Sequence, residues 1–178
     1  IGALTKKYPE ARWHQWEPVN RDEAHAGARL AFGESFDTNF RFERADVILS
    51  LDADFLACGP GHVRYTRDFA ARRQPDAAGV PGNRLYVLES TLSVTGAKAD
   101  HRLPALPGRI ALFARALAGR LGVAAAGGDA EKALGETETR WLDAVASDLT
   151  APGRKGRTLV IASDSQPANW SGGIMASA

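Results

Sequence analysis

The sequence predicts a three-layer α/β fold with a mainly parallel sheet, in one domain that spans residues 1–178. Short apolar runs alternate with segments of helical periodicity along the chain, which is the pattern of β-α-β units. Two of these runs, 47–52 and 158–162, are apolar at nearly every position. Strands that helices cover on both faces have this composition, so we expect both runs at the centre of the sheet.

Four strands and four helices account for the rest of the pattern. The strands are expected at 12–17, 47–52, 85–89 and 158–162. The helices are expected at 20–33, 60–72, 110–122 and 137–149, and loops at 124–128 and 151–156. The first helix has Asn20 followed by Glu23, which resembles a capping box. The third has Ile110, Phe113 and Leu117 at spacings of three and four, which indicates a buried helical face.

Composition excludes several classes of function. The 22 Lys and Arg residues against 21 Asp and Glu residues give a net charge of +1, which leaves no basic footprint for nucleic acid. No apolar run reaches the roughly 20 residues of a membrane-spanning helix. The single cysteine, Cys58, cannot hold an iron–sulfur cluster or a cysteine-rich zinc site, and we expect it to be a small, partly buried hydrophobic residue. The histidines lack metal-binding spacing, so we expect no metal.

Acidic residues stand at the expected carboxyl ends of the strands, where open α/β sheets bind ligands. They are Glu17, Asp52, Asp54, Glu89 and Asp164. Carboxylates at one edge suit sugar hydroxyls, cations or arginine partners and would repel a pyrophosphate, and Glu89 is best placed to hold a ribose diol. The alternative is structural: the carboxylates cap loops and pair with Arg84, Arg102 or Arg109.

Two loops near this edge are candidates for binding. The polar segment 95–104 precedes the helix at 110–122, and two interpretations stay open for it. It is a binding loop, or it is a crossover loop held by Asp100 pairing with Arg102 or Arg84. The turn at 58–62 lacks the glycine spacing of a phosphate-binding loop, so a tight strand-to-helix connection explains it better.

Four longer segments carry a resemblance to a known family. They are WHQWEPVNRD (13–22), ADVILSLDADFL (45–56), GPGHVRYTRDFAARR (59–73) and RLYVLESTLSVTGAKADHRLP (84–104). In this order they resemble the molybdopterin-oxidoreductase-like region of the iron–sulfur subunit of alternative complex III, a bacterial quinol oxidoreductase. The resemblance runs from about residue 8 to residue 166, and the tail at 169–173 departs from it.

The resemblance implies a Rossmann-like domain of a larger subunit whose iron–sulfur clusters lie in a different, ferredoxin-like part. The chain begins with Ile1 and contains a single cysteine, Cys58, so we expect it to be the cluster-free part of a longer protein. The family also implies export by the twin-arginine route and a place on the periplasmic side of the bacterial inner membrane. Its partners there are haem-bearing and quinol-binding subunits of a respiratory complex.

The resemblance also bears on the cofactor. In molybdopterin enzymes the strand matching 47–51 leads into a small turn, where this chain has Asp52 and Asp54. A later signature of the same enzymes is matched at Pro107 and Gly108. Arg109 and Ile110 then stand at the positions where the signature has a threonine and an acidic residue. We therefore expect a non-catalytic domain with no bound cofactor and a vestigial crevice at Asp52, Asp54, Glu89, Thr95 and Asp100. The alternatives are a domain that still binds molybdopterin guanine dinucleotide, and a nucleotide-binding module that uses Glu89.

Overall fold

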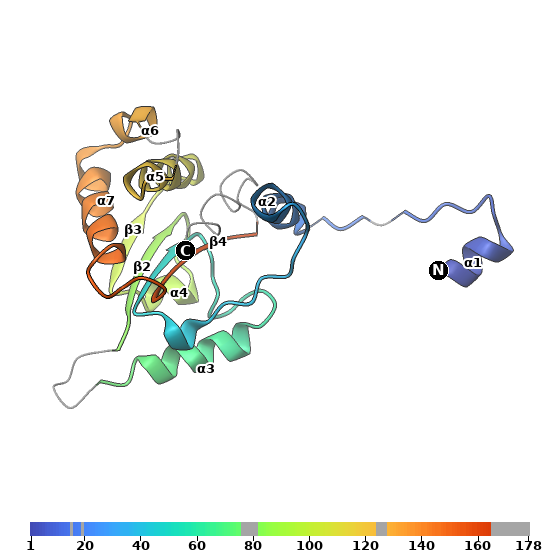
Figure 1. Cartoon of the computed structure of the whole chain (residues 1–178), viewed down its shortest axis with the longest axis horizontal. Coiled ribbons are helices and arrows are strands. Elements are labelled where there is room, and N and C mark those ends of the chain that lie inside the picture. The colour runs from blue at the N-terminus through green and yellow to red at the C-terminus, as the bar shows by residue number, and fades with distance from the viewer. Residues whose placement is uncertain (15, 19, 76–81, 124–127, 165–178) are drawn as a thin grey trace.

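A four-stranded, all-parallel sheet lies at the centre of the computed structural model, which describes residues 1–14, 16–18, 20–75, 82–123 and 128–164 (Figure 1). The strands are β1 (Val47–Leu51), β2 (Arg84–Glu89), β3 (His101–Pro104) and β4 (Thr158–Ala162). Their order in the sheet is β3-β2-β1-β4. This is a Rossmann-like topology, and it confirms the α/β prediction with a parallel sheet.

Helices precede, connect and cover the strands. They are α1 (Gly2–Lys7), α2 (Asp22–Phe32), the 3-10 helix η1 (Phe42–Arg44), α3 (His62–Arg72), α4 (Val94–Ala97), α5 (Pro107–Arg120), α6 (Gly128–Lys132) and α7 (Glu136–Leu149). Helices α2, α3, α5 and α7 match the four predicted helices to within a few residues at each end. Short helices α1, α4 and α6 were not predicted.

Two hydrophobic clusters, one on each face of the sheet, form the core. Because side chains alternate along a strand, Leu49 packs in a cluster with Phe113 of α5 and Leu142 of α7. Its neighbour Ile48 packs on the other face in a cluster with Phe69 of α3. Helix α3 thus covers one face and α5 with α7 covers the other, which is the predicted three-layer arrangement.

The strand order contains one reversal. The chain passes from β1 to β2 to β3 in one direction across the sheet, and then returns to β4 on the other side of β1. Parallel α/β sheets of this kind bind ligands in the crevice at such a reversal, beyond the carboxyl ends of the strands. The carboxyl ends of β1 and β4 therefore mark the place where a ligand site is expected.

One predicted strand is not found in the described residues, and one strand of the sheet was not predicted. In the described part of the segment 12–17 no residue belongs to a strand, and the chain before α2 runs away from the sheet (Figure 1). The segment 95–104, expected to be a loop, instead contains part of α4 and all of β3. Strand β3 lies at the edge of the sheet with side chains that are exposed or half-buried, so it lacks the apolar run that marks a central strand.

Helix boundaries differ from prediction in small ways. Helix α3 starts at His62, two residues late, because Gly59 and Gly61 take left-handed conformations with φ of 82° and 85°. Asn20 accepts a hydrogen bond from the amide of Asp22 and so stands one residue before the cap position of α2. Helix α6 begins at Gly128 in the region expected to be a loop; residues 124–127 and the tail at 169–173 lie outside the described residues.

Candidate functional site at the carboxyl edge of the sheet

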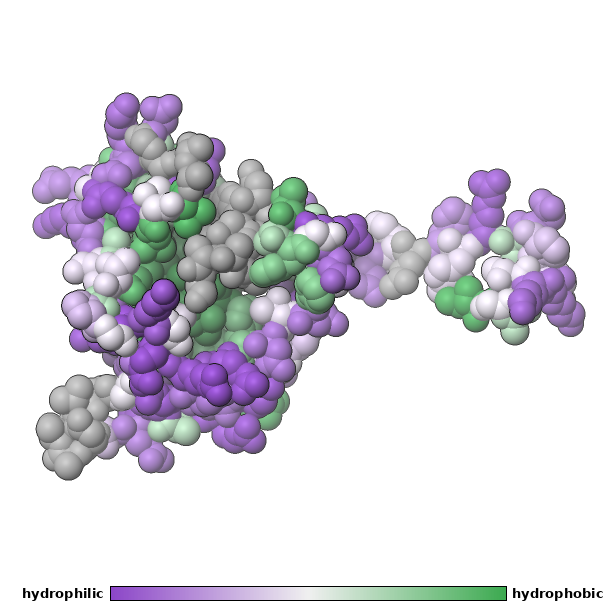
Figure 2. Space-filling view, viewed as in Figure 1, coloured by the Kyte–Doolittle hydropathy of each residue, from purple (hydrophilic) through white to green (hydrophobic). Residues whose placement is uncertain are grey.

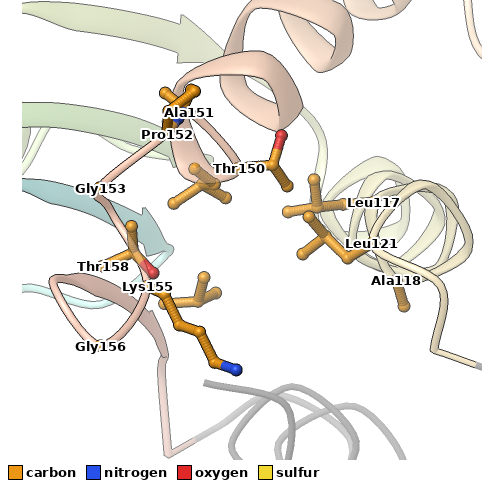
Figure 3. A pocket seen from close by; sticks show the side chains of 12 residues that line it. Leu117, Ala118, Leu121, Thr150, Ala151, Pro152, Gly153, Lys155, Gly156 and Thr158 are labelled. Carbon is orange, nitrogen blue, oxygen red and sulfur yellow. The ribbon is translucent and has the colours of Figure 1, made fainter.

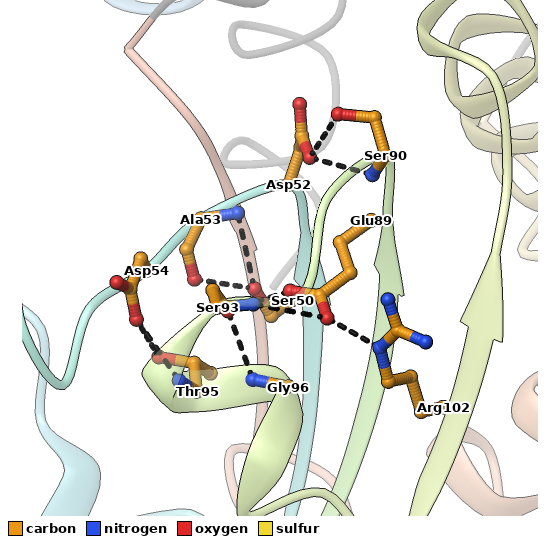
Figure 4. A network of polar contacts seen from close by, with 10 residues as sticks. All are labelled: Ser50, Asp52, Ala53, Asp54, Glu89, Ser90, Ser93, Thr95, Gly96 and Arg102. Atoms are coloured by element: carbon orange, nitrogen blue, oxygen red, sulfur yellow. Dashed lines mark hydrogen bonds and ion pairs between the residues drawn. The ribbon is translucent and has the colours of Figure 1, made fainter.

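Loops that follow β1 and β2 leave the sheet side by side, because Leu51 and Leu88 are register partners. Figure 4 shows Asp52 and Ser90 pointing toward each other, and Asp54 and Glu89 pointing toward residues at the start of α4. The predicted residues Asp52, Asp54, Glu89 and Thr95 all belong to this network. We call it the loop network, defined by Ser50, Asp52, Ala53, Asp54, Glu89, Ser90, Ser93, Thr95, Gly96 and Arg102.

Asp52 ties the β1 loop to the end of β2. Its Oδ1 accepts hydrogen bonds from the backbone amide of Ser90 at 3.0 Å and from the Ser90 hydroxyl at 3.2 Å. The residue has a φ of 57°, in the left-handed region, where Asp is one of the few residue types that occur with any frequency. The carboxylate therefore caps a neighbouring loop, as the structural interpretation predicts.

Asp54 holds helix α4 against the β1 loop. Its Oδ1 accepts from the amide of Thr95 at 2.9 Å and from the Thr95 hydroxyl at 2.7 Å. The same hydroxyl oxygen accepts from the amide of Leu56 at 3.2 Å, and the Thr95 side chain is fully buried. Thr95 thus links the two loops from inside the protein and faces no solvent.

Glu89 forms a buried ion pair below α4. Its side chain is 2% exposed and accepts hydrogen bonds from the Arg102 Nε at 2.5 Å and the Ser93 hydroxyl at 2.5 Å. Gly96 packs directly over it, since a Cβ there would lie 1.8 Å from the Glu89 Oε1. Arg102 was one of the predicted partners, and the other two arginines bind Asp148 and Glu138.

Asp100 lies at the opposite edge of the sheet, which corrects its predicted place in the crevice. It immediately precedes β3, and its carboxylate accepts from the amide of Leu85 at the amino end of β2 at 2.7 Å. Arg73, rather than a predicted arginine, donates two hydrogen bonds of 2.8 Å to it. Burial raises the pKa of Asp100, but the bonds from Arg73 and Leu85 outweigh it and leave the pKa lowered. The error follows from the missed strand β3. A residue that directly precedes a parallel strand lies at the amino edge of the sheet, whereas Asp100 was expected at the carboxyl edge.

A pocket of about 580 Å³ opens at the reversal in strand order. Ala53 and Asp54 from the end of β1, and Ala162 and Asp164 from the end of β4, line one side of it. Its other walls come from α2, the segment 36–40 and the start of α3. We call this the switch pocket, after the topological switch point at which it lies.

Polar groups of the switch pocket are paired more loosely than those of the loop network. The Arg21 Nε donates to the Asp164 Oδ2 at 2.7 Å, and its Nη1 lies 3.4 Å from Asp37. Cys58, expected to be partly buried, is exposed in the pocket wall with its Sγ 3.8 Å from Asp54. Sequence reasoning did not find Arg21, whose position just before a helix gives no signal of a contact 143 residues away. Glu17 was expected here but is not among the lining residues.

A second, apolar pocket of about 430 Å³ lies on the other face of the sheet (Figure 3). Leu117 of α5 and Leu121, which directly follows this helix, form one wall, and residues 150–153, 155 and 156 form another. Val160 of β4 lines both this cavity and the switch pocket. We call the second cavity the apolar pocket. Figure 2 shows apolar residues gathered in the hollowed middle of this view, between the α5 and α7 helices and α2.

Metal and membrane features are not found in the described ranges. Within them, no group of three or more His, Cys, Asp or Glu side chains is arranged to hold a metal ion. In the same residues, no helix has the length and apolar character to span a bilayer. No protein-family model matches the chain, and no curated protein matches its sequence significantly.

Proposed function

We propose that this chain is a non-catalytic, molybdopterin-oxidoreductase-like structural domain of an iron–sulfur electron-transfer subunit in a quinol-oxidising respiratory complex. One observation carries the proposal beyond the sequence resemblance. The carboxylates of Asp52, Asp54 and Glu89 each accept hydrogen bonds from side chains or amides of the same domain. The crevice residues act as internal braces, which is the role expected in a domain that keeps the fold without the cofactor.

The residues of the loop network do not fit a dianionic pyrophosphate. Such a group needs free backbone amides or cations, and the amides of Ser90 and Thr95 already donate to Asp52 and Asp54. Like charges brought together in a low-dielectric site repel each other strongly. A cofactor phosphate would have to displace two carboxylates and break these bonds, so the loop network does not accommodate it.

The proposed context follows from the family. The iron–sulfur clusters would be held by a different part of the subunit, since this chain has one cysteine. Other subunits of the complex would be its partners, on the periplasmic side of the inner membrane. In that setting the domain supports its neighbours and carries no electrons itself.

A second candidate function is a domain that still binds molybdopterin guanine dinucleotide. The switch pocket favours it, because its position and its volume of about 580 Å³ are those of a ligand site in a parallel α/β sheet. Arg21 and His25 are the basic side chains among its described lining residues, and Arg21 is the one that would carry a charge to an anion at neutral pH. The weaker nucleotide-binding alternative relies on Glu89, whose pairing with Arg102 would have to break first.

The test is a cofactor analysis of the whole protein that contains this chain, produced in a host that makes the pterin. Acid extraction converts any bound molybdopterin into a fluorescent oxidised pterin, which is measured beside molybdenum, tungsten and iron. We expect iron without pterin, molybdenum or tungsten. Stoichiometric pterin would overturn the proposal in favour of the cofactor-binding domain, and protein with neither iron nor pterin would refute the electron-transfer context.

A further inference from the structure

The apolar pocket is an accessible space beside the hydrophobic core. Leu117, Leu149 and Val160 line it, and all three belong to the cluster that α5 and α7 form on one face of the sheet. The loop after α7 forms its rim and includes Gly153 and Gly156. A Cβ at either glycine would meet nothing within 4 Å, so the rim is not packed at these two points. A cavity of about 430 Å³ with apolar walls has the size of a small-molecule site.

The charge at this pocket comes from one lysine. Among the described lining residues, Lys155 is the only charged side chain. The other two cations of its loop have partners elsewhere. Arg154 pairs with Asp148 at 3.6 Å. Arg157 pairs with Asp46 at 2.5 Å. The Lys155 ammonium makes no ion pair or hydrogen bond within the described ranges, so the pocket has an unpaired positive charge beside its apolar walls.

Side-chain orientations in the pocket agree with this division between an apolar wall and a charged group. Figure 3 shows Leu117 and Leu121 pointing into the cavity, and Lys155 extending along it with its nitrogen away from the loop. A lysine stem covers apolar surface in this way while its ammonium stays available to a partner. The Thr150 hydroxyl is already used, since it donates to the carbonyl of Ala146 at 2.8 Å. Lys155 is therefore the group that selects the polar end of a ligand.

We propose that the apolar pocket binds a medium-chain aliphatic carboxylate. Its alkyl chain lies between α5 and β4, and its carboxylate binds the Lys155 ammonium. Each methylene that leaves water for the apolar walls strengthens binding about fourfold. The described lining residues include no carboxylate that would repel the anionic end. A cavity of about 430 Å³ holds one short chain, so it does not accept the two long chains of a phospholipid. This inference does not depend on the proposed function.

Calorimetric titration of the full chain with sodium octanoate at pH 7 tests the proposal. We expect one site with a dissociation constant below about 1 mM. Butanoate has four fewer methylenes and should bind at least about fiftyfold more weakly. Octylammonium has the same chain and the opposite charge, and it should bind at least tenfold more weakly than octanoate. A dissociation constant for octanoate above about 1 mM, or equal binding of octanoate and octylammonium, would overturn the proposal.

Lys155→Met tests the role of the ammonium. The substitution keeps the length of the side chain and removes its charge, so octanoate should bind at least fivefold more weakly. Binding of 1-octanol, which has no charge, should stay within twofold of that to the parent. Lys132→Met is the matched control, because Lys132 is an exposed lysine of α6 that does not line the pocket. Equal affinity for octanoate in Lys155→Met and the parent would overturn the proposal.

Leu121→Trp tests where the alkyl chain lies. The larger side chain would enter the cavity, so we expect octanoate to lose at least tenfold in affinity. Leu121→Met has nearly the volume of the parent side chain and should bind octanoate as the parent does. Thermal unfolding establishes that both variants are folded. Parent-like affinity in folded Leu121→Trp would place the ligand outside this pocket and overturn the proposal, and if that variant does not fold, Lys155→Met decides.

Discussion

The two halves of the carboxyl edge differ in what their acidic side chains do. Between β1 and β2, the carboxylates of Asp52 and Glu89 bind loop amides, hydroxyls and a guanidinium, and Glu89 is 2% exposed. Between β1 and β4, Asp164 is 42% exposed and pairs with Arg21 at the wall of an open pocket. The same residue type at equivalent strand ends thus braces the fold in one half and faces solvent in the other.

A carboxylate at a strand end is therefore not by itself evidence of a ligand site. In the loop network, a ligand would compete with bonds that the domain has already made. In the switch pocket, it would displace mainly water and one half-exposed ion pair. Substitutions in the two halves should therefore have unequal effects on stability.

The largest effect is expected for Glu89→Gln. The substitution keeps the shape of the side chain but leaves Arg102 without its buried counter-charge, which should lower the free energy of unfolding by about 3 kcal/mol. Urea denaturation at pH 7 measures it. Glu34→Gln, at an exposed position, is the control and should change stability by less than about 0.5 kcal/mol. A loss no greater than that of the control would show that the loop network does not brace the domain.

Gly96→Ala should have the next largest effect. Its new Cβ would lie 1.8 Å from the Glu89 Oε1, so α4 or the ion pair must shift, at a cost of about 2 kcal/mol. Gly108→Ala is the matched control, since it also adds a methyl group to a helix and meets nothing within 4 Å. There alanine should be neutral or slightly stabilising. The melting temperatures of the two variants test this prediction, and that of Gly96→Ala should be the lower. Equal melting temperatures would contradict the close packing over Glu89.

Asp100→Asn tests the amino edge of the sheet, where the carboxylate braces two strands as in the loop network. The parent should be more stable than the variant by about 1.5 kcal/mol at pH 7, since hydrogen bonds from Arg73 and Leu85 favour the charged form. The pKa of Asp100 is lowered in the folded state, so its contribution is complete above the unfolded pKa near 3.9 and is lost as pH falls through the folded pKa. Urea denaturation at several pH values should show the two proteins converging in acid. A difference that stayed constant down to pH 2 would mean that the charge contributes nothing.

The central elements of this fold could be predicted from the sequence because their buried side chains recur at regular spacings along the chain. Strand β1 is buried at every position, and α5 buries Ile110, Phe113 and Leu117 at the predicted spacing. Strand β3 could not be read in this way, since its exposed and half-buried HRLP sequence carries no apolar run. Missing it also put Asp100 at the wrong edge, because the place of a residue in a parallel sheet depends on which end of a strand it occupies.

The structure brings together most of the predicted residues at the carboxyl edge of the sheet, whereas the residues of the switch pocket went largely unpredicted. Asp52, Asp54 and Glu89 were found because each follows or ends a strand, and the rule on strand ends needs only the sequence. The pairing of Glu89 with Arg102 was one of the alternatives, since the two residues are 13 positions apart in one segment. The switch pocket needs the position of α2 relative to β4, which no local pattern encodes. Arg21 was therefore missed.

The smallest effect is expected for the Arg21 and Asp164 pair of the switch pocket. Its side chains are 35% and 42% exposed, so solvent screens the attraction, and the coupling energy should be at most about 0.5 kcal/mol. A double-mutant cycle with Arg21→Gln and Asp164→Asn, measured by urea denaturation, isolates this coupling from the other effects of each substitution. Salt should weaken it further, because exposed charges are screened over about 10 Å at 0.1 M ionic strength. A coupling above about 1.5 kcal/mol that survives added salt would place this half of the edge beside the loop network as a brace. The distinction between a fixed half and an accessible half would then fail, and with it the reason for expecting any ligand at the switch pocket.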